Sequence, residues 1–267
     1  MVLSRGPGIP AGALAALFLV NLLALPDRAP AEPARTGASF VEEFDRLNEK
    51  RWYISDGWAN GTYQNCLWSA DQVSVGEGTL RLSFAERPSG ERRYACAEVQ
   101  SRQRFGHGVY EARMKAVAGS GFNTAFFTYI GPVHKQPWHE IDFEILGKDT
   151  SRVQLNHFVD GKGRNETLAT LPGDAEAAFH DYAFVWEKNR LRFFVNGQLV
   201  HTVTDPQKLP ARPMKILFSL WASETMPQWL GGFSDPGKPV SAVVARVSYT
   251  APGDPCQYPD SLVCRLD

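Results

Sequence analysis

From Phe40 onward, apolar and polar residues alternate over short stretches, and helical periodicity is scarce. Alternation is the pattern of a β-strand with one buried face, because successive side chains point to opposite sides of a sheet. It occurs at Val109–Lys115, Arg152–Phe158, Asp181–Glu187 and Lys215–Leu220. Turn residues lie between these stretches, at Gly119–Gly121, Gly131-Pro132, Gly161–Gly163 and Pro172-Gly173. Short strands at this spacing, without helical crossovers, predict a single all-β domain, an antiparallel sandwich.

One stretch predicts a β-hairpin in detail. Leu191–Val195 and Gln198–Val203 read as two strands, joined by Asn196-Gly197. Asn-Gly is the strongest short hairpin signal, because both residues tolerate positive φ.

The N-terminus has the pattern of a secretory signal peptide. Arg5 precedes an apolar stretch, Ala11–Leu25, and the small residues Ala29-Pro30-Ala31 follow. An uncleaved anchor is the alternative, but about 15 apolar residues are short for a membrane span, which needs about 20. We therefore expect a signal peptide at 1–31, a short linker at 32–39, one domain at 40–251 and an irregular tail at 252–267. Export predicts an extracellular or periplasmic protein, free of the membrane after cleavage.

Charge and composition narrow the class. The 28 basic residues nearly balance the 29 acidic ones, and no basic run with interleaved aromatics occurs, which argues against a nucleic-acid partner. Aromatic residues make up 12% of the chain and include seven Trp. Flat rings suit sugar binding, although core packing accounts for such rings equally well.

The four cysteines admit three disulfide pairings. We expect Cys66 to pair with Cys96, and Cys256 with Cys264. The first bond would close a loop of about 30 residues and stabilise the fold by roughly 3–4 kcal/mol. A metal site is the alternative, but no C-x-x-C spacing exists.

The segment Trp138–Gly147 is the most informative in the chain. On a β-strand, Glu140, Asp142 and Glu144 share one face, while the alternate residues Ile141, Phe143 and Ile145 face the core. Three neighbouring carboxylates repel one another, so the row requires an explanation. A solvated face and a calcium site are two alternatives.

Glycoside hydrolysis is the third explanation, because a retaining enzyme needs one carboxylate as nucleophile and one protonated carboxyl as acid. Asp142 between the two Glu would favour the protonated form of a neighbour. On a straight strand the Cα atoms of Glu140 and Glu144 would lie about 13 Å apart, so the side chains would have to lean together.

This segment, Glu-Ile-Asp-Phe-Glu-Ile-Leu-Gly-Lys-Asp-Thr at 140–150, resembles the catalytic strand of glycoside hydrolase family 16. The Glu-x-Asp-x-Glu spacing is that of the bacterial endo-β-1,3-1,4-glucanases, or lichenases, since laminarinases and carrageenases carry one extra residue. The resemblance to rhizobial succinoglycan-depolymerising glycanases extends over about residues 40–267, through Tyr53–Gly57, Tyr94–Gln100, Phe184–Arg190 and the Cys256/Cys264 tail.

The resemblance implies an antiparallel β-jelly-roll sandwich of the concanavalin A-like type, with a concave substrate cleft and a retaining double displacement. Glu140 would be the nucleophile, Glu144 the general acid/base and Asp142 an assisting group. Cys66 and Cys96 match the family's disulfide. The implied substrate-binding residues are Trp58, Asn60, Glu98, Phe127, Trp138, Gln154, Asn156, Trp221 and Trp229.

Some positions depart from the lichenase pattern. Gln100 replaces an Arg that contacts substrate, Ser219 replaces an Asn, and His139 replaces an acidic residue. These changes put specificity for cereal glucans in doubt. Ala245 replaces an Asp that ligates a structural calcium, so a calcium ion is possible but doubtful, and no other metal or cofactor is expected.

The sequence thus predicts a secreted, retaining endo-β-glycanase, a monomer whose partner is a polysaccharide. Its substrate would be β-1,3-1,4-type bonds in an exopolysaccharide such as succinoglycan, or in mixed-linkage β-glucan. Two rival classes are a transglycosylase of the same fold and a lectin-like sandwich that binds without cleaving. A binding module gains little from three carboxylates on one strand, which argues against the lectin.

Overall fold

The computed structural model describes residues 36–266, so the expected signal peptide and the start of the linker lie outside the described residues. The described part contains sixteen strands, one short α-helix and four 3-10 segments. The strands are β1 Phe40–Glu42, β2 Trp52–Ile54, β3 Cys66–Trp68, β4 Val73–Gly76, β5 Thr79–Ser89, β6 Arg92–Ser101, β7 Gly108–Lys115, β8 Phe122–Ile130, β9 His139–Leu146, β10 Arg152–Val159, β11 Thr167–Thr170, β12 His180–Trp186, β13 Leu191–Val195, β14 Gln198–Val203, β15 Lys215–Ala222 and β16 Val240–Thr250. The helical segments are η1 Ala70–Gln72, η2 Pro132–His134, η3 Pro206–Lys208, α1 Pro227–Leu230 and η4 Leu262–Arg265.

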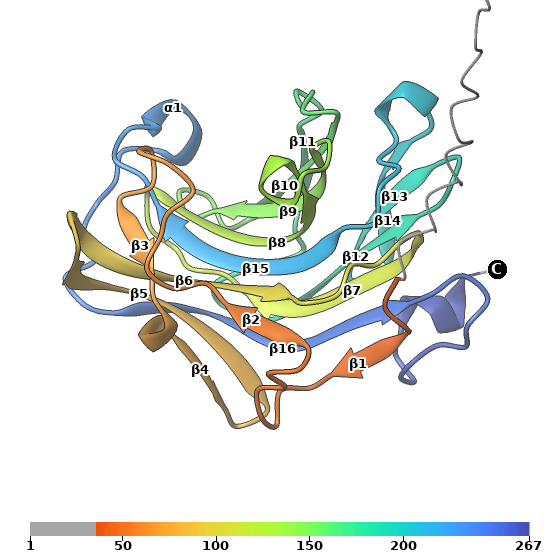
Figure 1. The fold of residues 1–267 in the computed structure, drawn as a ribbon, viewed down its shortest axis with the longest axis horizontal. Helices are drawn as coiled ribbons and strands as arrows, with labels where there is room; N and C mark the ends of the chain where they lie inside the picture. Colours follow the sequence, from red (N-terminus) through yellow and green to blue (C-terminus); the bar gives the residue numbers. More distant parts are fainter. Residues whose placement is uncertain (1–35, 267) are drawn as a thin grey trace, which may run out of the picture. The chain divides into compact units, whose positions relative to one another are not determined.

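The strands form two layers (Figure 1). The first layer, here called the cleft sheet, has the order β11-β10-β9-β8-β15-β6, with β2 beside β6. The second, the back sheet, has the order β5-β16-β7-β12-β13-β14, with β1 beside β16 and β4 beside β5. All pairings are antiparallel except β3 with β6, which is parallel over three residues. The expected antiparallel sandwich is confirmed.

One hairpin connects the two layers. β5 and β6 pair only near their shared turn, at Ala85–Ser89. Beyond it, β5 pairs with β16 in the back sheet, whereas β6 pairs with β15 in the cleft sheet. The chain thus passes between layers within one hairpin.

Aromatic side chains fill the space between the layers. Phe143 on β9 lies 5.5 Å from Phe193 and 5.4 Å from Tyr182, between ring centroids, and both partners belong to the back sheet. Ile141, Phe143 and Ile145 are fully buried, as the alternation of β9 predicts. This packing fixes which face of β9 carries the carboxylates.

The predicted hairpin is confirmed at β13 and β14. Asn196 and Gly197 have φ angles of 47° and 77°, and Val195 pairs with Gln198. The positive φ values explain why Asn-Gly stands there.

Both expected disulfides are present, Cys66–Cys96 and Cys256–Cys264. The second lies in the irregular tail, which a buried carboxylate also holds. Glu111 on β7 accepts hydrogen bonds from the Ser261 hydroxyl at 2.6 Å and the Leu262 amide at 2.7 Å. The disulfide closes a loop within the tail, whereas Glu111 fixes the tail to the back sheet.

No helix of the described residues is long and apolar enough to cross a membrane.

Phe143 provides a test of this packing. Phe143→Ala should lower the free energy of unfolding by about 3–5 kcal/mol, because the ring is fully buried between the layers. Leu168→Ala is the matched control; Leu168 is 55% exposed, and its change should stay within about 0.5 kcal/mol. Urea denaturation measures both, and a loss below about 1 kcal/mol for Phe143→Ala would contradict the assigned core.

Candidate active site

Strand register brings the carboxylates of β9 into rows with side chains of neighbouring strands. Glu144 pairs with Gln154 on β10 and with Ala125 on β8. Asp142 pairs in the same way with Asn156 and Phe127. Since paired residues of a sheet point to the same side, these groups share the outer face of the cleft sheet.

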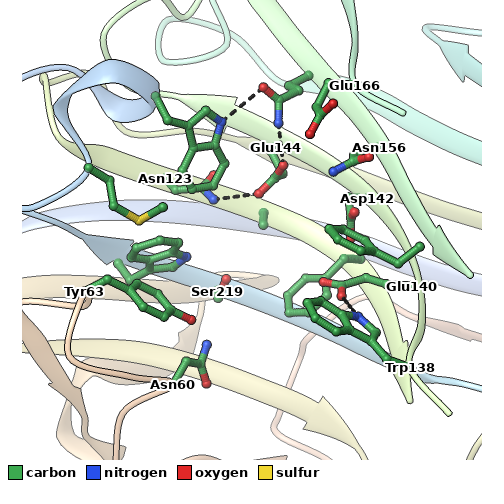
Figure 2. Close-up of a pocket in the computed structure, with 17 residues that line it drawn as sticks. Asn60, Tyr63, Asn123, Trp138, Glu140, Asp142, Glu144, Asn156, Glu166 and Ser219 are labelled. Atoms are coloured by element: carbon green, nitrogen blue, oxygen red, sulfur yellow. Dashed lines mark hydrogen bonds between the residues drawn. The ribbon is translucent and has the colours of Figure 1, made fainter. Parts of the chain in front are cut away.

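A cleft of about 500 Å³ lies on this face (Figure 2), within the range typical of ligand pockets. It brings together most of the expected residues, namely Asn60, Phe127, Trp138, Glu140, Asp142, Glu144, Gln154, Asn156, Trp221 and Trp229. It also contains residues that the sequence reasoning did not propose for the cleft: Tyr63, Asn123, Ala125, Phe158, Glu166, Ser219 and Met226.

Two expected substrate-binding residues are not part of the cleft lining. Glu98 is only 2% exposed and accepts hydrogen bonds from the Ser55 hydroxyl at 2.6 Å and the Gln100 amide at 2.8 Å. Trp58 is partly exposed, with its ring edge-on to Trp68. Substrate contact by Glu98 and Trp58 stays a prediction.

The environment of Glu140 is aromatic. The indole N–H of Trp138 donates a hydrogen bond to Glu140 Oε2. Trp138 is itself stacked on Phe158, with ring centroids 4.6 Å apart and planes at 12°. The stack fixes the indole, and the indole fixes the carboxylate.

Two amides hold Glu144. Asn123 donates to Oε1 at 3.0 Å, and Gln154 donates to Oε2 at 2.7 Å. The Gln154 carbonyl accepts from the Trp229 indole at 3.1 Å, which orients the amide so that its NH₂ faces Glu144. Asn123 was missed, although it stands four residues before the proposed Phe127 on the same strand and therefore faces the same side of the sheet.

Asp142 lies between the two Glu and has no hydrogen-bond donor. It is 3% exposed, and neither of its carboxyl oxygens accepts a hydrogen bond from the described residues. Burial raises its pKa well above the ordinary value, and the charges of Glu140 and Glu144 raise it further. A protonated Asp142 can donate its proton in a hydrogen bond to Glu140.

Burial is also the main cause of the raised pKa values of the flanking residues, about 8 for Glu140 and about 7 for Glu144. Donation by Trp138 partly offsets the effect at Glu140, and donation by Asn123 does so at Glu144. Because the three groups interact, protons are shared by the row as a whole. The row therefore holds both a proton and a carboxylate near neutral pH, which acid and nucleophilic catalysis both need.

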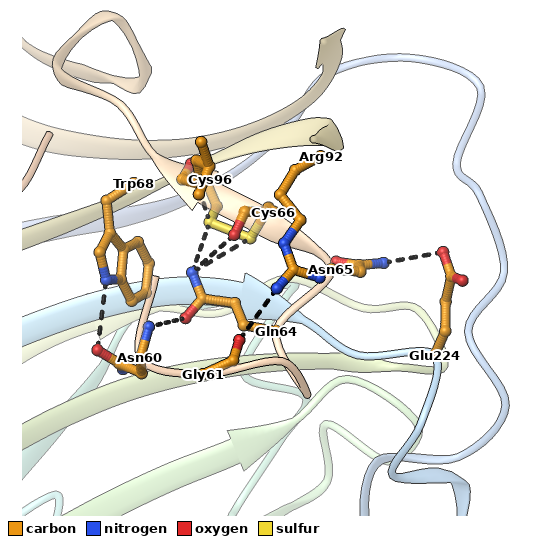
Figure 3. The surroundings of a disulfide bond; sticks show 10 residues. Asn60, Gly61, Gln64, Asn65, Cys66, Trp68, Arg92, Cys96 and Glu224 are labelled. Atoms are coloured by element: carbon orange, nitrogen blue, oxygen red, sulfur yellow. Dashed lines mark hydrogen bonds between the residues drawn. A yellow bond between two sulfur atoms is a disulfide. The ribbon is translucent and has the colours of Figure 1, made fainter. Parts of the chain in front are cut away.

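The loop that carries Asn60 and Tyr63 is anchored to the first disulfide (Figure 3). The Gln64 side chain accepts a hydrogen bond from the backbone N–H of Asn60 at 3.2 Å and donates one to the backbone carbonyl of Cys66 at 3.1 Å. Tyr63 lies edge-on to Trp221, with centroids 5.6 Å apart. The disulfide thus helps to place one wall of the cleft.

Within residues 36–266, no group of three or more His, Cys, Asp or Glu side chains is arranged to hold a metal ion. Ala245, at the position of the family's calcium-binding Asp, lies at a register shift of β16.

The sandwich, the cleft and the carboxylate row define a glycoside hydrolase. The family model of glycosyl hydrolases family 16 matches residues 60–234, and the chain belongs to this family.

Among its relatives, an endo-1,3-1,4-beta-glycanase, ExoK, of Rhizobium meliloti is 55% identical over 229 residues, covering 86% of this chain and 85% of that protein. A beta-glucanase of Bacillus amyloliquefaciens is 43% identical, covering 75% of this chain and 83% of that protein. The solved structure of the Bacillus licheniformis beta-glucanase is 40% identical, has a TM-score of 0.77, and covers 81% of this chain and all of that one. The expected family and jelly-roll fold are confirmed.

Asp142→Asn tests the protonation of the row. Because the folded-state pKa of Asp142 is raised, its protonated form contributes stability at low pH that is lost as the pH rises through that pKa. Asparagine cannot ionise, so the melting temperature of the variant should exceed that of the wild type by a margin that grows from about pH 5 to about pH 9.

Asp149→Asn is the matched control, since hydrogen bonds from Ser151 and Arg152 lower the pKa of this partly exposed carboxyl. It should not gain stability over the same range. A constant or shrinking margin for Asp142→Asn would contradict a protonated Asp142.

Proposed function

We propose that this chain is a secreted endo-β-glycanase that hydrolyses β-1,3-1,4-type bonds with retention of configuration. Its substrate is an exopolysaccharide such as succinoglycan, or a mixed-linkage β-glucan. The observation that carries the proposal is the row of three carboxyl groups on β9, Asp142 buried and Glu140 and Glu144 half-buried, in a cleft with aromatic walls. The printed activities of the relatives support the bond type.

In the proposed mechanism, Glu140 is the nucleophile. Its carboxylate attacks the anomeric carbon and forms a covalent glycosyl–enzyme, while Glu144 transfers its proton to the leaving glycosidic oxygen. Glu144 then removes a proton from water, which displaces Glu140 and restores both groups. Two inversions at one carbon give net retention.

The neighbours of the two Glu suit these roles. A protonated Asp142 donates a hydrogen bond to the Glu140 carboxylate. This bond stabilises the negative charge of Glu140 before it attacks the sugar and again when water displaces it. The amides of Asn123 and Gln154 favour the carboxylate form of Glu144, which is the base in the second step. Glu166 also faces the cleft, and its charge raises the pKa of Glu144, which favours the acid form in the first step.

The walls of the cleft suit a sugar chain. Rings of Trp138, Phe158, Trp221 and Trp229 offer surfaces against which the C–H faces of pyranosyl units can stack. Asn60 and Asn156 add amide groups that can bind hydroxyls.

We further propose that the reaction needs no cofactor, that calcium is not required, and that the enzyme acts as a monomer. The charged N-terminus, apolar stretch and Ala-Pro-Ala of residues 1–31 support a cleaved secretory signal.

Glu144→Ala and Glu140→Ala form a matched pair that tests the roles. Glu144→Ala should lower turnover of mixed-linkage glucan by about 10²–10⁴-fold, since the general acid is lost. With an activated aryl β-glycoside, whose leaving group needs no acid, added azide should restore activity and give a β-glycosyl azide. Glu140→Ala should give the α-azide instead, from one displacement.

Anomeric assignment of the azides by NMR separates the outcomes. An α-azide from Glu144→Ala, or near-normal turnover in Glu140→Ala, would overturn the assignment. Transfer of glycosyl units to added oligosaccharide in preference to water would indicate a transglycosylase.

A further inference from the structure

Lys215 lies on the same face of the cleft sheet as the catalytic row, and two arginines lie near it. Lys215 on β15 pairs with Tyr129 on β8, and Tyr129 pairs with Glu140 on β9. Lys215 therefore belongs to the strand row of Glu140, two strands away, or about 10 Å at the usual strand spacing. A short run of pyranosyl units can span this separation.

Arg102 and Arg104 add two guanidinium groups. Arg102 follows β6, and its guanidinium carbon lies 5.7 Å from the centre of the Tyr53 ring. Arg104 precedes Phe105, which forms an antiparallel bridge with Met214, the residue before Lys215. Both arginines lower the pKa of Lys215, although burial of Lys215 is the larger cause. The three residues, Lys215, Arg102 and Arg104, are called the cationic cluster below.

The cationic cluster has no counter-charge in direct contact. Among residues 36–266, no carboxylate oxygen lies within 4.0 Å, the limit for an ion pair, of a side-chain nitrogen of Lys215, Arg102 or Arg104. Several other arginines do have an acidic partner, as Arg113 has Asp181 at 2.7 Å. Arg102 Nε donates a hydrogen bond to the Glu49 carbonyl at 2.7 Å, but an uncharged carbonyl does not cancel the positive charge. Like charges held together without a counter-charge destabilise a fold, and a negatively charged ligand would offset this cost.

Gln100 keeps Lys215 away from the acid behind it. The Gln100 carbonyl accepts from the Lys215 ammonium at 3.3 Å, while its NH₂ donates to Glu98 at 2.8 Å. The amide thus stands between ammonium and carboxylate. An ammonium has three N–H groups, and Gln100 occupies one, so two remain for a ligand.

We propose that Lys215, Arg102 and Arg104 form a subsite for a carboxylate-bearing glycosyl unit of the substrate chain, bound a short distance from Glu140. This inference rests on the proposed function, because it assigns an acidic polysaccharide to the same cleft. The carboxylate belongs either to a uronic acid or to an acidic substituent. Ammonium and guanidinium groups bind either through charge-assisted hydrogen bonds.

The test compares Lys215→Met with the wild type on derivatives of one mixed-linkage glucan. One derivative is oxidised to carboxylate at its primary hydroxyls, a second is carboxymethylated, and a third is hydroxyethylated to the same degree. The hydroxyethyl group has similar bulk without charge. Lys188→Met, in the exposed turn between β12 and β13, is the control for loss of a lysine.

Lys215→Met should lower kcat/KM by about fivefold or more on at least one carboxylated glucan, and by less than about twofold on the hydroxyethylated one. The loss should appear mainly in KM and shrink at high salt, which screens charge. A loss on the oxidised glucan alone identifies a uronic acid, and a loss on the carboxymethylated glucan alone identifies a substituent. Lys188→Met should show no such difference.

Equal losses on charged and neutral glucans, or no loss on any, would overturn the subsite. Binding of the same polymers to Glu140→Gln, with and without Lys215→Met, keeps the test independent of turnover. If the wild type cleaves no polymer but Lys215→Met weakens binding of a carboxylated one, the proposed function fails and the subsite stands. If the wild type cleaves the polymers and Lys215→Met changes charged and neutral ones equally, the proposed function stands and the subsite is wrong.

Discussion

The structure depends on the electrostatic repulsion among three carboxyl groups on one face of β9 and on what offsets it. On the opposite face, Ile141, Phe143 and Ile145 are fully buried between the layers and hold the strand in place. Burial of apolar side chains thus stabilises an arrangement that electrostatics alone disfavours. The raised pKa values of the row have a separate main cause, which is the removal of the carboxyl groups themselves from water in the cleft.

The surroundings of the three groups differ, and this difference gives them different chemistry. Glu140 has one indole donor, Glu144 has two amide donors, and Asp142 has none. A buried carboxyl that accepts no hydrogen bond favours its protonated form, and in this form Asp142 can donate a hydrogen bond to Glu140. Two of the three donors are themselves held by neighbours, Trp138 by Phe158 and Gln154 by Trp229. The positions of Glu140 and Glu144 therefore rest on contacts from β8, β10 and Trp138.

The local sequence pattern predicted those features of the fold that depend on residues close together in the sequence. The alternation of β9 and the Asn196-Gly197 turn are of this kind, and both are confirmed. The passage of β5 and β6 into different layers depends on long-range pairing, which no local pattern encodes. For the same reason the sequence did not reveal that Tyr63 reaches the cleft, that Glu98 is buried outside its lining, or that Glu111 anchors the tail. The resemblance located most of the cleft residues, but the cationic cluster required the strand register.

The central claim is that Glu140 forms a covalent bond to the sugar while Glu144 handles the proton. The most direct measurement is to incubate the enzyme with a fluorinated mechanism-based glycoside that slows breakdown of the glycosyl–enzyme, then digest it and map the adduct by mass spectrometry. The account predicts one glycosyl group, on the peptide that spans β9, attached to Glu140. Attachment to Glu144, or no adduct together with a product of inverted configuration, would contradict it.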